Sequence, residues 1–303
     1  MAYIATSAVK STAIKETAPG VKPTSGNRYE LPRKTGSSLF AASGNEVTSD
    51  TIRPGLNANG SRRGPQSVTG TIEMNAFNAD VIDFLVSCAA GADFSGNVLK
   101  ASDGLTTFTR IDELASGRLE VNYGCAVNSF SINADALGIV QYSFGVAGLK
   151  QETATAFAGT FTSVPVPDTS QELQGIDIAN VTANGNTALK YSTLALSLES
   201  PRNPRYAISY ANADGFSSTT RNVTLTLTYF RDPAVDYGAI FDGTLKPFSF
   251  ELGAGTNGRR YTVYGTASMP ATQSGDDLMG QVVITAGMNS TEGTGFKVEK
   301  LTA

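Results

Sequence analysis

"NANGSRRGPQSVTGTIEMNAFNAD" (57–80) and "NADGFSSTTRNVTLTLTYFRDPAV" (212–235) align without a gap, 155 positions apart in a chain of 303 residues. Each begins with an Asn/Asp–Gly turn, where a positive φ costs little, and continues into alternating β-branched residues typical of a half-buried strand. An internal duplication explains this match better than coincidence. The identities at the same offset are Ser37/Ser192, Leu39/Leu194, Asn57/Asn212, Ala58/Ala213, Gly60/Gly215, Val68/Val223, Thr69/Thr224, Thr71/Thr226 and Ala79/Ala234.

Each copy contains further strands and one short amphipathic helix. The first helix is predicted over 78–90, with Val81, Phe84, Leu85 and Cys88 on its buried face and Asp80 and Asp83 near its N-terminal end. In the second copy Asp232 is the predicted cap, Pro233 takes the first helical position, and Tyr237, Ile240 and Phe241 make the buried face. Predicted strands cover 38–43, 128–133 and 139–148 in the first copy and 193–200, 247–252, 259–265 and 280–287 in the second.

These patterns predict a mainly β protein, in which a β-sandwich or open barrel with one short flanking helix is duplicated in tandem. We expect an N-terminal arm at 1–30, a first domain at 31–150, a linker at 151–190 and a second domain at 191–303. The arm and the long segment 42–66 are too polar to have cores of their own, so we expect them to become ordered on assembly.

Histidine is absent from the chain, which excludes Ser-His-Asp triads, Cys-His dyads and histidine-based metal sites. Cys88 and Cys125 are too few and too far apart for a zinc cluster, so we expect buried free thiols, with a single disulfide as the alternative. The net charge of −4 argues against a nucleic-acid-binding surface over the whole protein, but not against a local basic patch. We expect no catalytic residue, no cofactor and no metal ion.

The first twenty residues contain apolar runs broken by Lys10 and Lys15, which is unlike a signal peptide. No apolar run approaches the about 18 residues that would span a membrane. We therefore expect a soluble protein made in a cytoplasm, in which the N-x-[ST] matches at Asn180, Asn222 and Asn289 arise by chance.

Two motifs resemble those of enzymes. "GAGTNG" (253–258) has the glycine spacing of a dinucleotide site, but a strand is predicted on each side where such a site needs a following helix. We interpret it as a hairpin turn. Adjacent carboxylates occur at Asp112–Glu113 and at Asp276–Asp277; neighbours in sequence do not face each other, so we expect solvated charges.

Arginines cluster in the segment between the first two repeated strands. Arg62 and Arg63 are adjacent, and Arg53 precedes them in the same segment. This segment is either a solvated loop or a docking arm that meets acidic loops of a neighbouring subunit. The second is a hypothesis, in which these three arginines form the contact between stacked rings.

The order of several short motifs resembles the tail tube proteins of long, non-contractile bacteriophage tails. That family has an E-T-x-x-G-x-x-P start, a Ser-Leu strand, an S-[DE]-x-I-R segment, a V-x-G-x-I strand and a short helix. The resemblance covers about residues 12–150 and reaches the second half through the repeat, which departs from it by having Leu225 in place of the glycine. The matching residues are Glu16, Thr17, Gly20, Pro23, Ser38, Leu39, Ser49, Asp50, Ile52, Arg53, Val68, Gly70 and Ile72.

This resemblance implies a subunit whose rings stack into a hollow tube around a tape measure protein, with tail terminator and tail tip proteins at its ends. Such rings commonly contain six tube domains, so a doubled chain implies a trimer with pseudo-sixfold symmetry. DNA would pass through the lumen without specific binding, and an acidic chain suits that role because like charge prevents counterion-release binding. The protein would be located in the virion tail, after assembly in the host cytoplasm without a membrane.

Three alternatives stay open. The first is another β-rich virion protein, such as a decoration protein or a tail terminator, which would not assemble into tubes by itself. The second is a carbohydrate-binding β-sandwich, against which the absence of tryptophan counts, because sugar sites usually stack on aromatic rings. The third is an enzyme that depends on the carboxylates.

Overall fold

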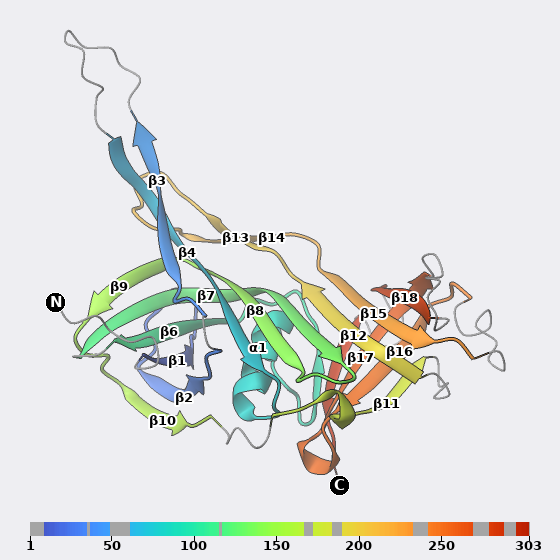
Figure 1. Cartoon of the computed structure of the whole chain (residues 1–303). Helices are drawn as coiled ribbons and strands as arrows, with labels where there is room; N and C mark the ends of the chain where they lie inside the picture. Colours follow the sequence, from blue (N-terminus) through green and yellow to red (C-terminus); the bar gives the residue numbers. More distant parts are fainter. Residues whose placement is uncertain are drawn as a thin grey trace.

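The computed structural model describes residues 9–34, 37–48, 61–114, 117–166, 172–183, 190–232, 242–268, 279–287 and 295–302. The protein is mainly β, as predicted, and the described chain contains one α-helix, α1 (Asp80–Ala90). The second predicted helix lies outside the described residues. Figure 1 shows a β body from which the ribbon of β3 (Ala41–Thr48) and β4 (Ser61–Asn75) projects.

Both halves repeat one order of antiparallel strand pairing. In the first half, neighbours follow the order β1 (Lys10–Lys15), β6 (Thr107–Leu114), β7 (Arg118–Asp135), β8 (Gln141–Gly148), β4 and β3. In the second, they follow the order β11 (Ile178–Ala183), β16 (Lys246–Leu252), β17 (Arg259–Ser268), β18 (Met279–Ala286), β15 (Asn222–Phe230) and β12 (Lys190–Glu199). β9 (Lys150–Ala154) and β19 (Phe296–Lys300) likewise pair with β7 and β17. The tandem duplication is therefore present in the fold itself.

The remaining strands fall where the sequence predicts an arm, a linker and loops. β2 (Ser25–Leu31) pairs with β1, and β10 (Thr160–Val164) runs parallel to β2. The expectation that residues 1–30 become ordered only on assembly is wrong for β1, which already pairs with β6 and has Ala13 and Ile14 completely buried against the body. The predicted linker also contributes β10, β11 and the short helix η3 (Gly175–Asp177). The domain boundaries themselves stay a prediction.

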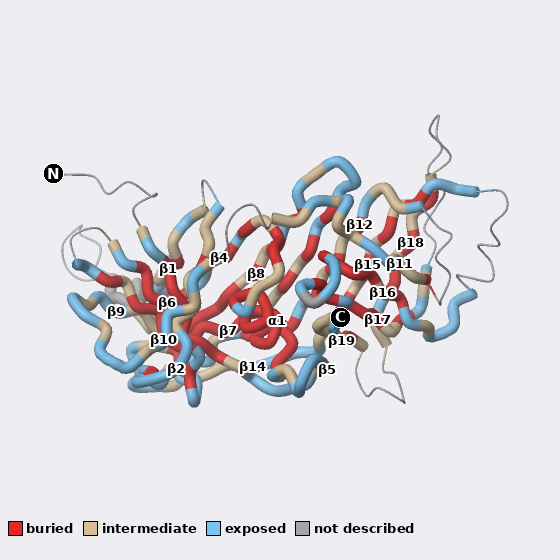
Figure 2. Tube along the Cα trace, turned by 90° about the horizontal axis from the view of Figure 1, so that it is seen from below, coloured by how far each residue is buried: buried red, intermediate tan, exposed pale blue. Residues whose placement is uncertain are grey.

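One hydrophobic cluster runs through both halves, and Figure 2 shows buried residues in the interior of the body from one half to the other. The predicted buried face of α1 is correct, but Ile82 and Val86 are buried as well, so the helix is enclosed on nearly every side. Gly91 ends α1 in the left-handed region at φ 69°, and a Cβ there would lie 2.3 Å from the carbonyl oxygen of Gly104.

The hairpin interpretation of residues 253–258 is confirmed. β16 and β17 are antiparallel neighbours paired from Lys246–Gly265 to Leu252–Arg259, and the glycines form the connection with η4 (Gly255–Asn257) inside it. No helix follows the glycine-rich stretch at this point, so the arrangement that a dinucleotide site requires is missing.

Candidate assembly interface

The two halves are joined edge to edge by main-chain pairing between β7 and β12. The pairing is antiparallel and runs from Ser129–Glu199 to Asp135–Thr193. Beyond its two ends the backbone amides of Ser200 and Ala136 donate hydrogen bonds across the same joint, at 2.8 Å and 3.0 Å. We call this β7–β12 joint the internal seam.

Side chains alternate along the internal seam in the way that a half-buried sheet requires. On one face Phe130 and Ile132 of β7 lie opposite Leu198 and Leu196 of β12, and all four are completely buried in the shared core. The opposite face is polar and at least partly exposed; it carries Ser129, Ser131, Asn133, Asp135, Thr193, Ala195, Ser197 and Glu199. The seam is thus part of the core and also part of the surface.

A buried ion pair fastens α1 to the second half. Both carboxylate oxygens of Asp83 accept hydrogen bonds from the Arg259 guanidinium at 2.8 Å, and Lys300 Nζ lies 2.7 Å from one of them. Burial lowers the pKa of Arg259, but hydrogen bonding and charge attraction from Asp83 outweigh it, so the pKa is raised overall. The sequence places Asp83 near the helix N-terminus, but it contains no signal for this partner 176 residues away.

Further contacts cross between the halves. The hydroxyls of Tyr142 and Tyr261 lie 3.2 Å apart in the core, where burial raises the pKa of both phenols. The Asn78 amide donates to the Leu252 carbonyl at 2.7 Å. The guanidinium of Arg202 donates to the Gly104 carbonyl at 2.8 Å, and β5 (Val98–Lys100) pairs with β19. The halves therefore share one extensive interface within a single chain.

Two of the three predicted ring-contact arginines lie on the β3–β4 ribbon. Arg62 and Arg63 lie on β4, where their backbones pair with those of Val47 and Glu46. Arg53 lies outside the described residues. The structure thus brings two of the three predicted residues together on a projecting ribbon (Figure 1) and does not test their role.

A second ribbon was not expected from the sequence. β13 (Arg202–Arg205) and β14 (Gly215–Ser218) form a two-stranded sheet in the place that the repeat assigns to the outer part of β3–β4. Its tip exposes large apolar side chains, with exposed fractions of 43% for Tyr206, 95% for Ile208 and 59% for Tyr210. Clustered exposed apolar side chains of this kind mark interaction surfaces.

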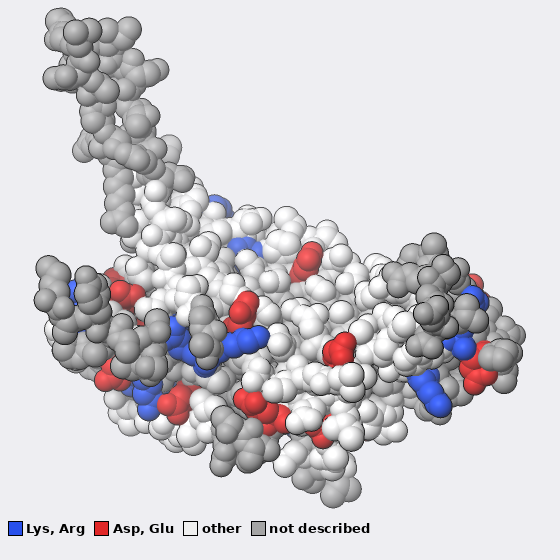
Figure 3. Space-filling view, viewed as in Figure 1, with Lys and Arg blue, Asp and Glu red and all other residues white. Residues whose placement is uncertain are grey.

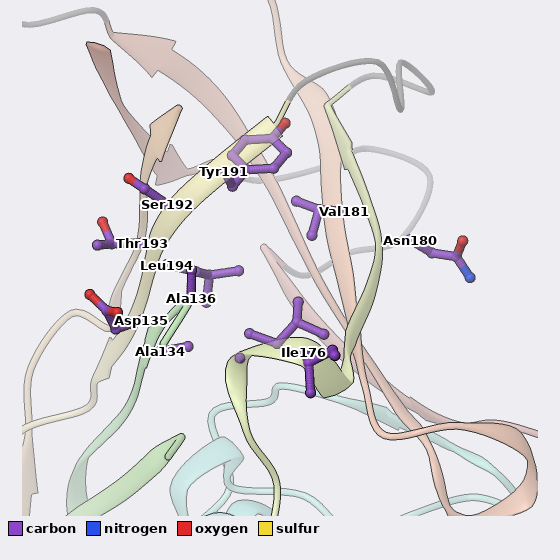
Figure 4. Close-up of a pocket in the computed structure, with 12 residues that line it drawn as sticks. Ala134, Asp135, Ala136, Ile176, Asn180, Val181, Tyr191, Ser192, Thr193 and Leu194 are labelled. Atoms are coloured by element: carbon purple, nitrogen blue, oxygen red, sulfur yellow. The ribbon is translucent and has the colours of Figure 1, made fainter. Parts of the chain in front are cut away.

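A cavity of about 570 Å³ opens at one end of the internal seam, between β11 and β12. Figure 4 shows Ile176, Val181 and Leu194 turned toward it, with Tyr191 above them and Asp135 and Thr193 on the adjoining strands. The Asp135 carboxylate accepts a hydrogen bond from the Leu137 amide at 3.0 Å and so stabilises the neighbouring hairpin. This lining combines polar and apolar side chains in similar measure and is continuous with the joint between the halves.

The adjacent carboxylates Asp112 and Glu113 differ in environment: Glu113 is exposed, as predicted, whereas Asp112 is not. The prediction that Asp112 is a solvated charge is wrong: it is completely buried, pairs with Arg110 at 2.9 Å and accepts from Ser11 Oγ at 2.5 Å. Burial lowers the pKa of Arg110, and Asp112 opposes that shift. Asp276 and Asp277 lie outside the described residues.

Glu16, the first residue of the family-like motif, is buried and holds the start of the chain in place. Its carboxylate accepts hydrogen bonds from the backbone amides of Gly20 and Gly124 at 2.9 Å and 2.8 Å, and from the hydroxyls of Thr107 and Thr109 at 2.8 Å and 2.7 Å. The spacing of Glu16 and Gly20 therefore reflects a turn closed by a carboxylate.

Charged residues on the face shown in Figure 3 are scattered, and no patch of one sign dominates that view. Both cysteines are free and buried, as predicted, and burial raises the pKa of each thiol. Among the described residues no group of three or more His, Cys, Asp or Glu side chains is arranged to hold a metal ion. No α-helix in that part of the chain is long and apolar enough to cross a membrane.

The chain was compared with known proteins. A family model described as phage tail tube protein matches residues 6–291. A search of the curated proteins found no match.

Proposed function

This chain belongs to the phage tail tube protein family, and from that membership we propose that it is the ring-forming subunit of a long, non-contractile tail. As a member of this family it is a structural protein of the virion tail that assembles into a tube with other tail components. In the proposal, three chains form a ring with pseudo-sixfold symmetry, and rings stack around a tape measure protein. DNA later passes through the lumen, and tail terminator and tip proteins occupy the ends.

The observation that carries the proposal is the internal seam. It joins two copies of one fold, and the joined surfaces differ: β7 of the first copy meets β12, the counterpart of β3, of the second. Such a heterologous contact leaves an unused surface of each kind at the two ends of the chain. Repetition of a heterologous contact gives a ring when the rotation closes, which also removes exposed strand edges.

Stacking of rings is supported by the two ribbons. β3–β4 projects from the body, and β13–β14 lies on the same upper side in Figure 1. One ribbon carries Arg62 and Arg63, and the other exposes Ile208 and its neighbouring tyrosines. These ribbons are the proposed contacts with the next ring. Assembly takes place in the host cytoplasm before the tail joins the virion.

The test is negative-stain electron microscopy of the purified protein over a concentration series, combined with native mass spectrometry of the smallest assembly. We expect hollow tubes, or rings with six similar lobes and the mass of three chains. A monomer at every concentration, including in the presence of a purified tail-tip complex as initiator, would contradict the proposal. Rings of six chains would contradict the trimer while retaining the tube.

A further inference from the structure

We infer that neighbouring chains are joined by a copy of the internal seam in which Ser43 of β3 lies opposite Ser268 of β17 in the next chain. This rests on the proposed ring and adds to it the partner, the strands and the register. The partner is a second copy of this chain. The first half has a free counterpart of β12, and the second half has a free counterpart of β7, so two chains can repeat the contact that the halves make within one chain.

The first step identifies the counterpart of β12 at the free end of the chain. Val68 and Val223 correspond in the repeat, and they pair with Ala42 and Leu198 respectively. β3 therefore holds the place of β12, with Ala42 at the position of Leu198. This correspondence is one residue out of step with the 155-residue offset of the sequence repeat, and it places the buried Phe40 at the position of the buried Leu196. The next residue, Ser43, takes the position of Glu199.

The second step identifies the counterpart of β7. Thr71 and Thr226 correspond in the repeat; Thr71 pairs with Gly145 and Thr226 pairs with Val283. Gly145 in turn pairs with Ser129 of β7, and Val283 pairs with Ser268 of β17. Ser268 thus takes the position of Ser129.

The internal seam gives the register, since Glu199 lies opposite Ser129. The same pairing between chains places Ser43 opposite Ser268. The neighbouring pair, Ser200 and Asn128, is hydrogen-bonded through the Ser200 amide at 2.8 Å. Glu199 and Ser129 are consequently a non-hydrogen-bonded pair, in which the Cα atoms approach to about 4.5 Å.

The described chain contains residues 37–43 on one side of the proposed joint and β17 up to Ser268 on the other; residues 269–274, which take the positions of Phe130–Asp135, lie outside the described residues. β3 pairs with β4 on one side, and the residue pairings of the described chain give it no partner strand on the other. β16 covers one side of β17 only as far as Gly265, so that side is open at Ser268 within the part described. Charged residues and prolines usually protect an edge strand from pairing with another chain. The stretch Ala41–Gly44 contains neither. An edge without such protection fits a strand that is covered in the assembly.

The experiment uses cysteine pairs in the full chain. Ser43→Cys and Ser268→Cys are made singly and together, and the assembled protein is oxidised mildly and run on a non-reducing gel. A non-hydrogen-bonded pair has the Cα separation that a disulfide accepts. We expect the double variant to give covalent trimers, and a mixture of the two single variants to give covalent dimers and nothing larger. Each single variant alone stays monomeric on the gel.

Three controls match this pair. Ser129→Cys with Glu199→Cys tests the template, and it forms a disulfide within one chain. Ser43→Cys with Thr266→Cys shifts the register by two residues; diagonal neighbours lie about 7–8 Å apart, too far for a disulfide, so this variant stays reduced. The native thiols stay outside the reaction, because Cys88 and Cys125 are buried with raised pKa values.

The outcomes separate the two proposals. If microscopy shows rings or tubes but the Ser43–Ser268 variants stay reduced while the internal control oxidises, the register is wrong and the ring proposal stands. Cross-linking of the shifted pair instead of the in-register pair would also overturn the inference. If there are no assemblies and no cross-link forms with an initiator present, the proposed function fails as well.

Discussion

At the scale of single residues, the two copies of the repeat differ at a core position, where the first has Gly70 and the second has Leu225. Phe40 directly precedes β3, and extending the β3–β4 register by one residue places it opposite Gly70. A Cβ on Gly70 would lie 2.1 Å from Phe40 Cδ1. In the second half Leu196 lies opposite Leu225. The first half fills this part of the core with the large ring of Phe40 beside a glycine, Gly70. The second half fills it with two leucines, Leu196 and Leu225.

The first prediction concerns Gly70→Ala, which puts a methyl group where the Phe40 ring lies. We expect the free energy of unfolding to fall by about 2 kcal/mol, as is usual for overpacked cores. Adding Phe40→Leu should restore part of that loss, although it also removes the ring that stacks on Arg110 at 3.9 Å. Urea denaturation of the single and double variants measures the coupling; strictly additive losses would contradict the packing argument.

How far the sequence predicts single residues depends on the distance to their partners. The strand predicted over 139–148 is present as β8, and its alternating buried positions, such as Tyr142 and Phe144, follow from the local pattern. Asp112 was predicted wrongly because Arg110 and Ser11, on the same and the neighbouring strand, make its burial tolerable. The spacing of residues in the sequence does not predict the pairing between β1 and β6, which places Ser11 opposite Asp112.

At the scale of elements, the two ribbons have diverged in chemistry. The 155-residue offset aligns Ile208 with Arg53, and it aligns Ser217 and Ser218 with Arg62 and Arg63. One ribbon therefore carries positive charge where its counterpart is apolar or neutral. In the proposed ring the β3–β4 and β13–β14 ribbons alternate. We therefore expect the two ribbons to make different types of contact with the next ring.

The second prediction is charge reversal on the first ribbon, Arg53→Glu with Arg62→Glu and Arg63→Glu. We expect rings of unchanged mass but severalfold shorter tubes at low salt, because the substituted side chains would repel acidic loops of the next ring. The difference should shrink at high salt, where such contacts are screened. Electron microscopy of tube length against salt concentration measures both effects.

The control for this variant is Arg118→Glu, an exposed arginine at the start of β7 that belongs to the β6–β7 hairpin and to neither ribbon. It changes the charge of the chain in the same direction by a smaller amount. Equal shortening by both variants would indicate a general effect of charge, and unchanged length in the ribbon variant would remove the arginines from the ring contact.

Elements with strong local patterns were predicted well, and those defined by distant partners were not. The strands of the repeat and the 253–258 hairpin follow from alternation and turn residues. β10 has no such signature: it is exposed over most of its length and is a strand because β2 offers a parallel edge. β13 contains Pro204, a residue that argues against a central strand and fits a two-stranded ribbon.

At the scale of the whole molecule, the halves are tied by one core and by a buried ion pair. Asp83 is the anion that neutralises both Arg259 and Lys300 where α1 meets the second half. Removing one member of a buried pair leaves an uncompensated charge, which costs more than the pair itself contributes.

The third prediction is that Asp83→Asn lowers the free energy of unfolding by about 3 kcal/mol. The control is Asp93→Asn, which removes an exposed pair with Lys15 and should cost less than about 1 kcal/mol. Urea denaturation compares the two variants at one ionic strength. Equal losses would mean that the Asp83 pair contributes no more than a surface contact. The sequence predicts two halves of one fold, but not this joint, whose partners lie more than a hundred residues apart.

The internal seam also changes how a ring responds to dilution. In the proposed ring every second joint lies within a chain, where the polypeptide keeps the partners at a high effective concentration. Nucleation of a ring then requires the meeting of three molecules, and its rate falls less steeply with concentration than it would for six separate domains. A tandem gene product of this kind can start tails early in an infection, when little of it has been synthesised.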